Sequence, residues 1–363
     1  MKKMKIGFLI PYSGVFPSLK EDFLQGFLLA FPRGWEERLS FLYEFIQMGD
    51  LKKVQDALQK LIMFDRVNVV VGIVSNNVIA QCTDIYVPRK IPVLINNLGA
   101  RIPDQHFSNP FLFYNSLHLW KSQWSMGHWA QQQFGGTPSI NMALYESGYS
   151  LHECFKLGTA ASGAEQVHLN ILKYTPGNVD ATPLVDYLLA QKPAHAHVLL
   201  SGKEAHHFLE QYHAAGCSAN LSVSPFMADA TLMPDMSLLE NTHHATTWSV
   251  DLPADENKKF VDNYRDGYQE TPTVFSMLGY ESGLMVAEEM QVKQVKGPRG
   301  DVNFSTEPLS ALLPVYIRKT VKRNGQIIHE QISKEPGISW SDEALIRGSG
   351  MEASGWQNPY LCV

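Results

Sequence analysis

The stretch from Val67 to Pro103 constrains the fold more than any other part of the sequence. Val67–Ile73 is a continuous apolar run rich in β-branched residues, which is typical of a strand buried on both faces of a parallel sheet. Val78–Val87 then predicts a helix that Pro88 stops, and Ile91–Ile95 predicts a second buried strand. The stretch therefore predicts a βαβ unit in a parallel sheet.

Polar side chains follow both of these strands. Ser75, Asn76 and Asn77 come after the first strand, and Asn96 and Asn97 end the second. Ligands of open α/β sheets bind at the carboxyl ends of the strands, and free N–H groups at helix N-termini there favour anions. Residues of these types also make ordinary turns and helix caps, so a ligand site and plain turn chemistry are both open interpretations.

The strand–helix alternation extends over most of the chain. Two further strands are predicted before Val67, at Lys5–Tyr12 and Leu39–Ile46, and residues 103–116 interrupt the pattern. A helix at Leu119–Phe134 then opens a second series, with strands at Ile140–Tyr145, Val167–Lys173, His197–Leu200 and Leu221–Ser224. The pattern predicts an α/β protein with two Rossmann-like, doubly wound parallel-sheet lobes.

The last third of the chain has a different pattern. Helices are predicted at Ala254–Gly267 and Thr273–Met290, followed by strands at Val315–Val321 and Ile327–Ile332. Asn324-Gly325 between those strands is the strongest hairpin signal in the sequence. Residues 333–363 show no regular pattern, and we assign them no structure.

Composition narrows the partners of the chain. The 363 residues carry a formal net charge of −6, which argues against nucleic acid as a partner. No apolar run has the roughly 18–20 residues that a transmembrane helix needs. The apolar run after Lys5 is too short for a signal peptide, so we expect an export signal, if there was one, to have been removed.

Motifs for catalysis and metal binding are missing from the sequence. It contains no GxGxxG after a strand, no GxxxxGK[ST], no HExxH and no GxSxG. His207 and His213 are spaced for different faces of a helix, and the His195/His197 pair lacks a third ligand nearby. The four cysteines have no metal-type spacing, and any disulfide pairing is open. We therefore predict no enzyme activity, no cofactor and no metal.

Several segments in order resemble the type I periplasmic binding proteins, specifically the leucine/isoleucine/valine-binding branch of the ABC-transporter solute receptors. The opening IGFLIPYSGVFPSLKEDFLQGFLLA is similar to that branch's first strand, Ser-Gly loop and helix. VNVVVGIVSNNVIAQCTDIYVPRKIPVLINNLGA, ALYESGYS and GPRGDVNFSTEPLSALLPVYIRKT resemble later segments of the family. The likeness covers roughly residues 5–332.

The resemblance implies two lobes that are joined by a three-crossover hinge and close around a small ligand in the cleft between them. Lobe I would hold 1–118 and 250–300, and lobe II 119–249 and 301–363. The ligand would be an amino acid, an amino-acid derivative, a small carboxylate or an amide, and the partner an ABC-transporter permease. We expect a monomer in the periplasm, or outside the cell on a lipid anchor. The alternative is a ligand-sensing regulator of the same fold, similar to the amide sensors, with no transport role.

The resemblance also implies a set of ligand-binding positions. Tyr149 matches the family's tyrosine in lobe II, whereas Phe226 stands near the acidic residue that pairs with an amino acid's ammonium group. An unpaired buried ammonium is costly, so we expect the ligand not to be an ordinary α-amino acid unless Asp229 or Glu281 substitutes. The predicted ligand-binding residues are Leu19, Ser75, Asn76, Asn77, Asn96, Asn97, Gly99, Tyr149, Lys203, Phe226 and Phe275.

Overall fold

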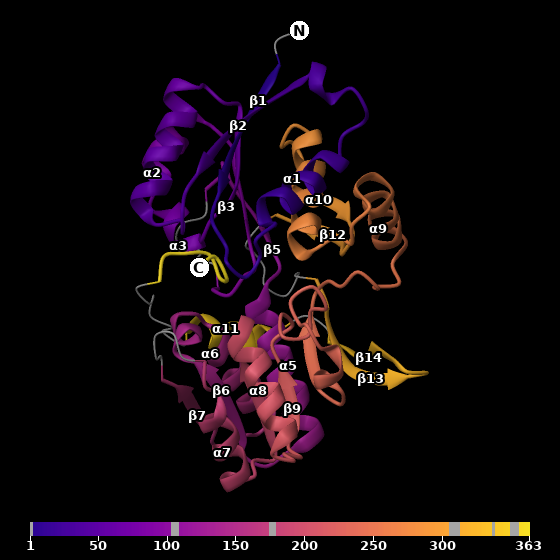
Figure 1. Cartoon of the computed structure of the whole chain (residues 1–363). Helices are drawn as coiled ribbons and strands as arrows, with labels where there is room; N and C mark the ends of the chain where they lie inside the picture. The colour runs from indigo at the N-terminus through magenta and orange to yellow at the C-terminus, as the bar shows by residue number, and fades with distance from the viewer. Residues whose placement is uncertain (1–2, 103–108, 174–178, 305–312, 336–337, 349–355) are drawn as a thin grey trace. The chain divides into compact units, whose positions relative to one another are not determined.

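The computed structural model divides into two compact units, each of which is an α/β unit built around its own sheet (Figure 1). It describes all residues except 1–2, 103–108, 174–178, 305–312, 336–337 and 349–355. Unit 1 comprises Met1–Leu117, Trp248–Leu313 and Gln357–Val363, and unit 2 comprises His118–Thr247 and Pro314–Trp356. None of the described helices combines the length and apolarity that crossing a bilayer requires.

Unit 1 contains a five-stranded sheet in the order β2-β1-β3-β4-β5, and every neighbouring pair is parallel. The predicted alternation of strands and helices in this part is therefore confirmed. β5 was not predicted, because its sequence LFYNS is short and mixes apolar and polar residues. β5 is a strand because it pairs with the edge of β4, which supplies its hydrogen bonds. The strands are β1 Met4–Ile10, β2 Leu39–Phe45, β3 Val69–Ile73, β4 Val93–Asn97 and β5 Leu112–Ser116.

Helices cover both faces of this sheet (Figure 1). One face carries α1 Leu19–Leu29, α9 Asp255–Tyr268 and α10 Val274–Ala287. The other carries α2 Leu51–Gln59 with its π-helical extension Lys60–Phe64, α3 Asn76–Ala80 and α4 Thr83–Tyr86, and the apolar core between these helices and the sheet is fully buried. The single helix predicted over 78–87 was wrong, because Gln81 and Cys82 leave helical geometry and split it into α3 and α4.

Unit 2 contains a seven-stranded sheet in the order β14-β13-β10-β9-β8-β6-β7. Its strands are β6 Pro138–Ala143, β7 His168–Leu172, β8 His195–Leu199, β9 Asn220–Val223, β10 His243–Thr246, β13 Val315–Arg323 and β14 Gln326–Glu335. β6 to β10 are parallel, and β13 and β14 add an antiparallel hairpin. Asn324 and Gly325 form its turn with φ of 50° and 82°, as the sequence predicted.

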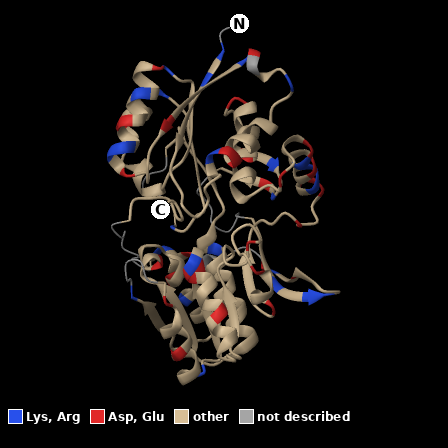
Figure 2. Ribbon diagram, viewed as in Figure 1, with Lys and Arg blue, Asp and Glu red and all other residues tan. Residues whose placement is uncertain are grey.

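The helices of unit 2 are α5 Leu119–Phe134, α6 Leu151–Ala161, α7 Thr182–Gln191, α8 Gly202–Ala214 and α11 Trp340–Gly348. α5 has the bounds predicted from the sequence, whereas α11 lies in the segment to which we assigned no structure. Acidic and basic residues are interleaved along α2 and α9 of unit 1 (Figure 2).

The unit boundaries differ from the predicted lobe boundaries in the last third of the chain. The prediction placed 301–363 in lobe II. Strand β12, Gly300–Asn303, pairs with β11, Gln294–Gly297, and both belong to unit 1. The last residues, Gln357–Val363, also pack in unit 1. Strand pairing and packing, which the sequence pattern did not show, decide these boundaries.

Glycines bring two helix pairs into backbone contact, one pair in each unit. A Cβ added at Gly26 of α1 would lie 1.9 Å from the Ser276 main-chain oxygen of α10, and one at Gly279 would lie 2.1 Å from the Phe23 main-chain oxygen. In unit 2, a Cβ at Gly158 of α6 would lie 2.0 Å from the Trp124 main-chain oxygen of α5. These distances leave no room for any side chain, so the helices pack at the separation that glycine alone allows.

We predict that Gly279→Ala destabilises unit 1 by about 3 kcal/mol, because the methyl group forces α1 and α10 apart. Gly267→Ala in α9 is the matched control. No atom lies within 4 Å of the Cβ position at Gly267, so the gain in helix propensity should stabilise the protein by about 0.5–1 kcal/mol. Urea unfolding followed by circular dichroism measures both changes. Equal effects of the two substitutions would contradict the packing argument.

Candidate ligand-binding site

The polar residues at the ends of β3 and β4 lie together in unit 1 and bond mainly to one another. The Asn97 amide donates to the Val74 main-chain oxygen at 3.3 Å and to the Asn76 side chain at 2.8 Å. Its oxygen accepts from the Gly99 N–H and the Ser116 hydroxyl, both at 3.0 Å. The side chain of Asn97 has therefore used its hydrogen-bonding capacity within the unit, where it orders the loop.

Asn96 is also a structural residue. Its side chain is fully buried, its oxygen accepts from the Ser282 hydroxyl of α10 at 2.7 Å, and its amide donates to the Gly72 main-chain oxygen at 3.4 Å. These contacts join β4 to β3 and to the helix that covers the sheet. Asn96 is thus enclosed within unit 1, and a direct contact between Asn96 and a ligand stays a prediction.

A buried ion pair continues this polar network. The Arg299 guanidinium donates from Nε and Nη2 to the two oxygens of the Glu281 carboxylate, at 3.0 and 2.6 Å. Its remaining bonds go to the Ser116 main-chain oxygen at 2.7 Å and to the Asn115 side chain at 2.8 Å. Both charged side chains are at most 1% exposed. Glu281 was one of two residues considered as a partner for a ligand ammonium, and this pairing removes it from that role.

We predict that Arg299→Met destabilises the protein by about 3–5 kcal/mol, because it leaves the Glu281 carboxylate buried without its partner. The double substitution Arg299→Met, Glu281→Leu should recover most of that loss, since no buried charge remains. Lys52→Met, which breaks an exposed pair with Asp56, is the control and should cost at most about 0.5 kcal/mol. Urea titrations at pH 7 give the three values. A loss below about 1 kcal/mol for Arg299→Met would sink this account.

The C-terminal segment Gln357–Val363 lies over the strand-end loops of unit 1. The Gly14 N–H donates to the Val363 main-chain oxygen at 2.7 Å, and the Ser13 hydroxyl donates to that of Leu361 at 2.5 Å. The Ser75 hydroxyl donates to the Gln357 main-chain oxygen at 2.8 Å. Ser75, which the sequence suggested for a ligand, and the neighbouring donors of Ser13 and Gly14 are therefore bonded to oxygens of the protein's own chain.

This segment is an integral part of unit 1. Tyr360, Leu361 and Cys362 are at most 3% exposed. Burying a leucine side chain contributes about 1.5–3 kcal/mol, and each hydrogen bond adds about 0.5–1.5 kcal/mol. A ligand would have to replace all of these contacts to displace the segment. Sequence reasoning missed it, and the only signal was the apolar cluster Tyr360-Leu361-Cys362-Val363 after Pro359.

The other predicted residues of unit 1 occupy varied surroundings. Leu19 begins α1 and is buried, and Phe275 is buried with its ring 5.0 Å from that of Phe16. Ser75 caps α3 by accepting from the Val78 N–H at 3.4 Å, and the half-buried Asn77 follows in the first turn of this five-residue helix. So short a helix offers an anion little of the dipole that the longer predicted helix would have supplied.

Three predicted residues belong to unit 2. Tyr149 is 4% exposed, and its hydroxyl lies 2.8 Å from that of Tyr145. Phe226 follows β9 and is also buried, whereas Lys203 is exposed in the first turn of α8. Asp229, the second residue considered for an ammonium, accepts through Oδ1 from the N–H and the hydroxyl of Thr231, at 2.8 and 2.7 Å.

The comparison with protein families decides what kind of protein this is. The profile of the periplasmic binding protein family matches residues 3–300. The chain belongs to this family. The resemblance inferred from the sequence is thereby confirmed, and a general role in solute binding follows. No curated protein matches the sequence.

Solved structures share the fold of this periplasmic binding protein at low sequence identity. A Sphaerobacter thermophilus ABC transporter substrate-binding protein has a TM-score of 0.78 and 19% identity, covering 93% of this chain and 98% of that one. A solute-binding protein of Rhodopseudomonas palustris BisB5, in complex with 3,4-dihydroxybenzoic acid, has a TM-score of 0.74 and 19% identity. The match covers 93% of this chain and 98% of that one. A branched-chain amino acid binding protein of Streptococcus pneumoniae, in complex with isoleucine, has a TM-score of 0.69 and 15% identity. The match covers 92% of this chain and 99% of that one. Identities this low show the fold alone.

The histidines considered as metal ligands have other surroundings. His197 is buried between the Ser222 hydroxyl, 2.9 Å from Nδ1, and the Gln123 side-chain oxygen, 2.6 Å from Nε2. His207 Nδ1 accepts from the Ala181 N–H, and His213 bonds a main-chain oxygen. Within the described ranges, no three His, Cys, Asp or Glu residues lie close enough together to hold a metal ion. All four cysteines are free thiols.

Buried histidines make unit 2 sensitive to acid. His195 is 1% exposed between the rings of Phe134 and Phe155, and neither of its ring nitrogens has a hydrogen-bond partner in the described part of the chain. Burial lowers the pKa of His195 from 6.5 to about 4. The unfolded chain therefore binds a proton at a pH where the folded chain does not. The contribution of His195 to stability is therefore fully present above pH 6.5 and is lost as the pH falls toward 4.

We predict that the wild-type protein loses about 2 kcal/mol of stability between pH 7.5 and pH 5.0 through His195 alone. His195→Leu should remove that part of the loss, because leucine takes up no proton in the unfolded chain. His168→Gln, at an exposed position on β7, is the control and should leave the difference between the two pH values unchanged. Urea unfolding at both pH values tests this. An identical pH dependence in His195→Leu and wild type would contradict it.

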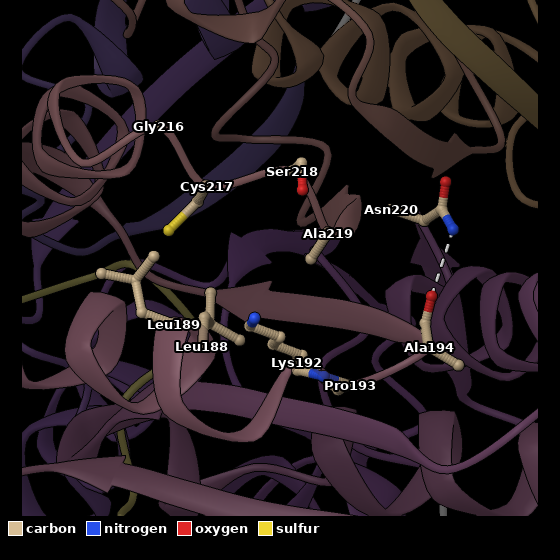
Figure 3. A pocket seen from close by; sticks show the side chains of 10 residues that line it. All are labelled: Leu188, Leu189, Lys192, Pro193, Ala194, Gly216, Cys217, Ser218, Ala219 and Asn220. Atoms are coloured by element: carbon tan, nitrogen blue, oxygen red, sulfur yellow. Dashed lines mark hydrogen bonds between the residues drawn. The ribbon is translucent and has the colours of Figure 1, made fainter.

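A surface cavity of about 400 Å³ lies elsewhere in unit 2 (Figure 3). It is lined by Leu188 and Leu189 of α7 and by residues 192–194 and 216–220, and the Asn220 amide donates across it to the Ala194 main-chain oxygen at 3.1 Å. These residues lie before β8 and before or at the first residue of β9, so the cavity is at the amino ends of these strands. Ligands of such sheets bind at the opposite, carboxyl ends, and no predicted site residue lines it.

Proposed function

We propose that this periplasmic binding protein is the solute receptor of an ABC transporter and that its ligand is a small carboxylate or amide without an α-ammonium group. One observation supports the ligand class: the buried Glu281 carboxylate, which we considered for an ammonium, is paired with Arg299. Phe226 is an apolar side chain near the position at which the family resemblance implies an acidic residue, and Asp229 already accepts two hydrogen bonds from Thr231 through one of its oxygens. A buried ammonium without a carboxylate partner costs several kcal/mol.

The proposed contacts of the ligand follow from the loops of each unit. Asn76, Asn77 and Gly99 in unit 1 and Tyr149 in unit 2 stay candidates for direct contact, with Leu19, Phe226 and Phe275 as apolar candidates. Ser75, Asn96 and Asn97 are better explained as supports, because their side chains bond within unit 1. The only observation that supports Lys203 as a ligand-contacting residue is that its side chain is exposed. The capture of the ligand between two closing lobes, which the family resemblance implies, stays a prediction.

Partners and location complete the proposal. Family membership implies a periplasmic or extracellular location. An ABC-transporter permease is the proposed partner of the loaded protein, which would act as a monomer. Anchoring through a lipid, the absence of nucleic-acid binding and the absence of catalysis are also predictions.

We predict that benzoate or 4-hydroxybenzoate raises the melting temperature of the purified protein more than leucine, isoleucine or valine does. A ligand at 100 times its dissociation constant stabilises the folded protein by about 2.7 kcal/mol. For a chain of this size such a gain shifts the transition by several degrees. Differential scanning fluorimetry with each compound over a concentration series is the measurement, and native mass spectrometry searches for a co-purified ligand. A large shift with isoleucine at micromolar concentration, and none with the acids that lack an amine, would overturn the proposed ligand class.

A further inference from the structure

The side chain of Trp356 is bound against the loop that carries Tyr149. Its indole Nε1–H donates to the Tyr145 main-chain oxygen at 3.1 Å, yet the residue is 43% exposed. The polar edge of the indole is thus bonded to the protein while part of the ring stays accessible. An indole held in this way offers a neighbouring molecule its apolar face rather than a hydrogen-bond donor.

Gly148 makes room for this indole. A Cβ added at Gly148 would lie 1.3 Å from Cδ1 and 1.7 Å from Nε1 of Trp356. The φ of Gly148 is not positive, so space rather than backbone conformation requires glycine at this position. The loop and the indole therefore fit each other, which an exposed side chain without a role would not need.

Other groups near Trp356 hold the arrangement in place. The rings of Tyr145 and Tyr149 lie 5.3 Å apart in an edge-to-face arrangement on the same loop. Tyr149 therefore lies beside Tyr145, whose main-chain oxygen accepts the hydrogen bond of the indole.

We propose that Trp356 is a ligand-contacting residue that selects solutes with a planar, apolar body, such as aromatic acids. The proposal rests on the solute-binding function proposed above and names the ligand class more closely. The indole face stacks on a flat ring, and Tyr149 on the same loop supplies a second aromatic contact. A branched aliphatic side chain cannot stack in this way, so Trp356 discriminates against leucine-type solutes.

The test measures the binding of benzoate, 4-hydroxybenzoate and isoleucine by isothermal titration calorimetry. Trp356→Ala should weaken binding of the aromatic acids at least tenfold, whereas Trp356→Phe, which keeps a ring, should stay within about threefold of wild type. Leu345→Ala is the matched control, because Leu345 is 61% exposed in the same unit, on α11, and should not alter binding. Thermal melts of each variant show whether it folds.

Gly148→Ala provides a second route to the same answer, because its methyl group displaces the indole without changing it. It should weaken binding of the aromatic acids in wild type and add nothing in the Trp356→Ala background. Equal affinities of wild type and Trp356→Ala for an aromatic acid would overturn the role of Trp356 and leave the solute-binding function intact. Binding of isoleucine alone would overturn the ligand class. If wild type binds none of a broad screen of small solutes, the proposed function fails and this inference fails with it.

Discussion

The buried pair of Arg299 and Glu281 is the interaction on which the arrangement of unit 1 depends. The guanidinium joins the hairpin of β11 and β12 to the end of β5 and to α10, and it holds Asn115 and the main chain of Ser116 in place. Ser116 in turn bonds Asn97, and Asn97 bonds Asn76 at the start of α3. Because each of these groups is buried, losing one leaves its neighbours unsatisfied, so the ends of the strands form one rigid polar network.

This rigidity limits what the strand-end loops can do for a ligand. Asparagine and serine side chains at such positions suggest hydrogen bonds to a solute, but here most of them bond the protein itself. The segment Gln357–Val363 extends the effect, because its main-chain oxygens take the donors of Ser13, Gly14 and Ser75. A carboxylate that needed these donors would compete with buried contacts of the fold. In the proposed function, ligand specificity depends on fewer groups, and aromatic rings are proposed to be among them.

The two units solve a similar packing problem with different side chains. In each, a glycine allows the backbones of two neighbouring helices to touch, α1 with α10 and α5 with α6. The interior beneath α5 and α6 in unit 2 contains histidines where unit 1 has mainly apolar residues. Since burial keeps these histidines neutral, unit 2 should be the part of the protein that acid affects first.

The sequence by itself determined the fold class, the strand–helix alternation over most of the chain and the Asn324-Gly325 hairpin, because these follow from local periodicity and turn chemistry. It also indicated the family and the loops at the strand ends. Tertiary structure alone decided that β5 is a strand, that Glu281 is consumed by Arg299, and that the last residues cover the loops near Ser13 and Ser75. Each of these depends on contacts between residues 18 to more than 300 positions apart, for example Glu281 with Arg299 and Ser13 with Leu361. A pattern read along the chain shows which groups are available for bonding, but only the folded chain shows which partners have taken them.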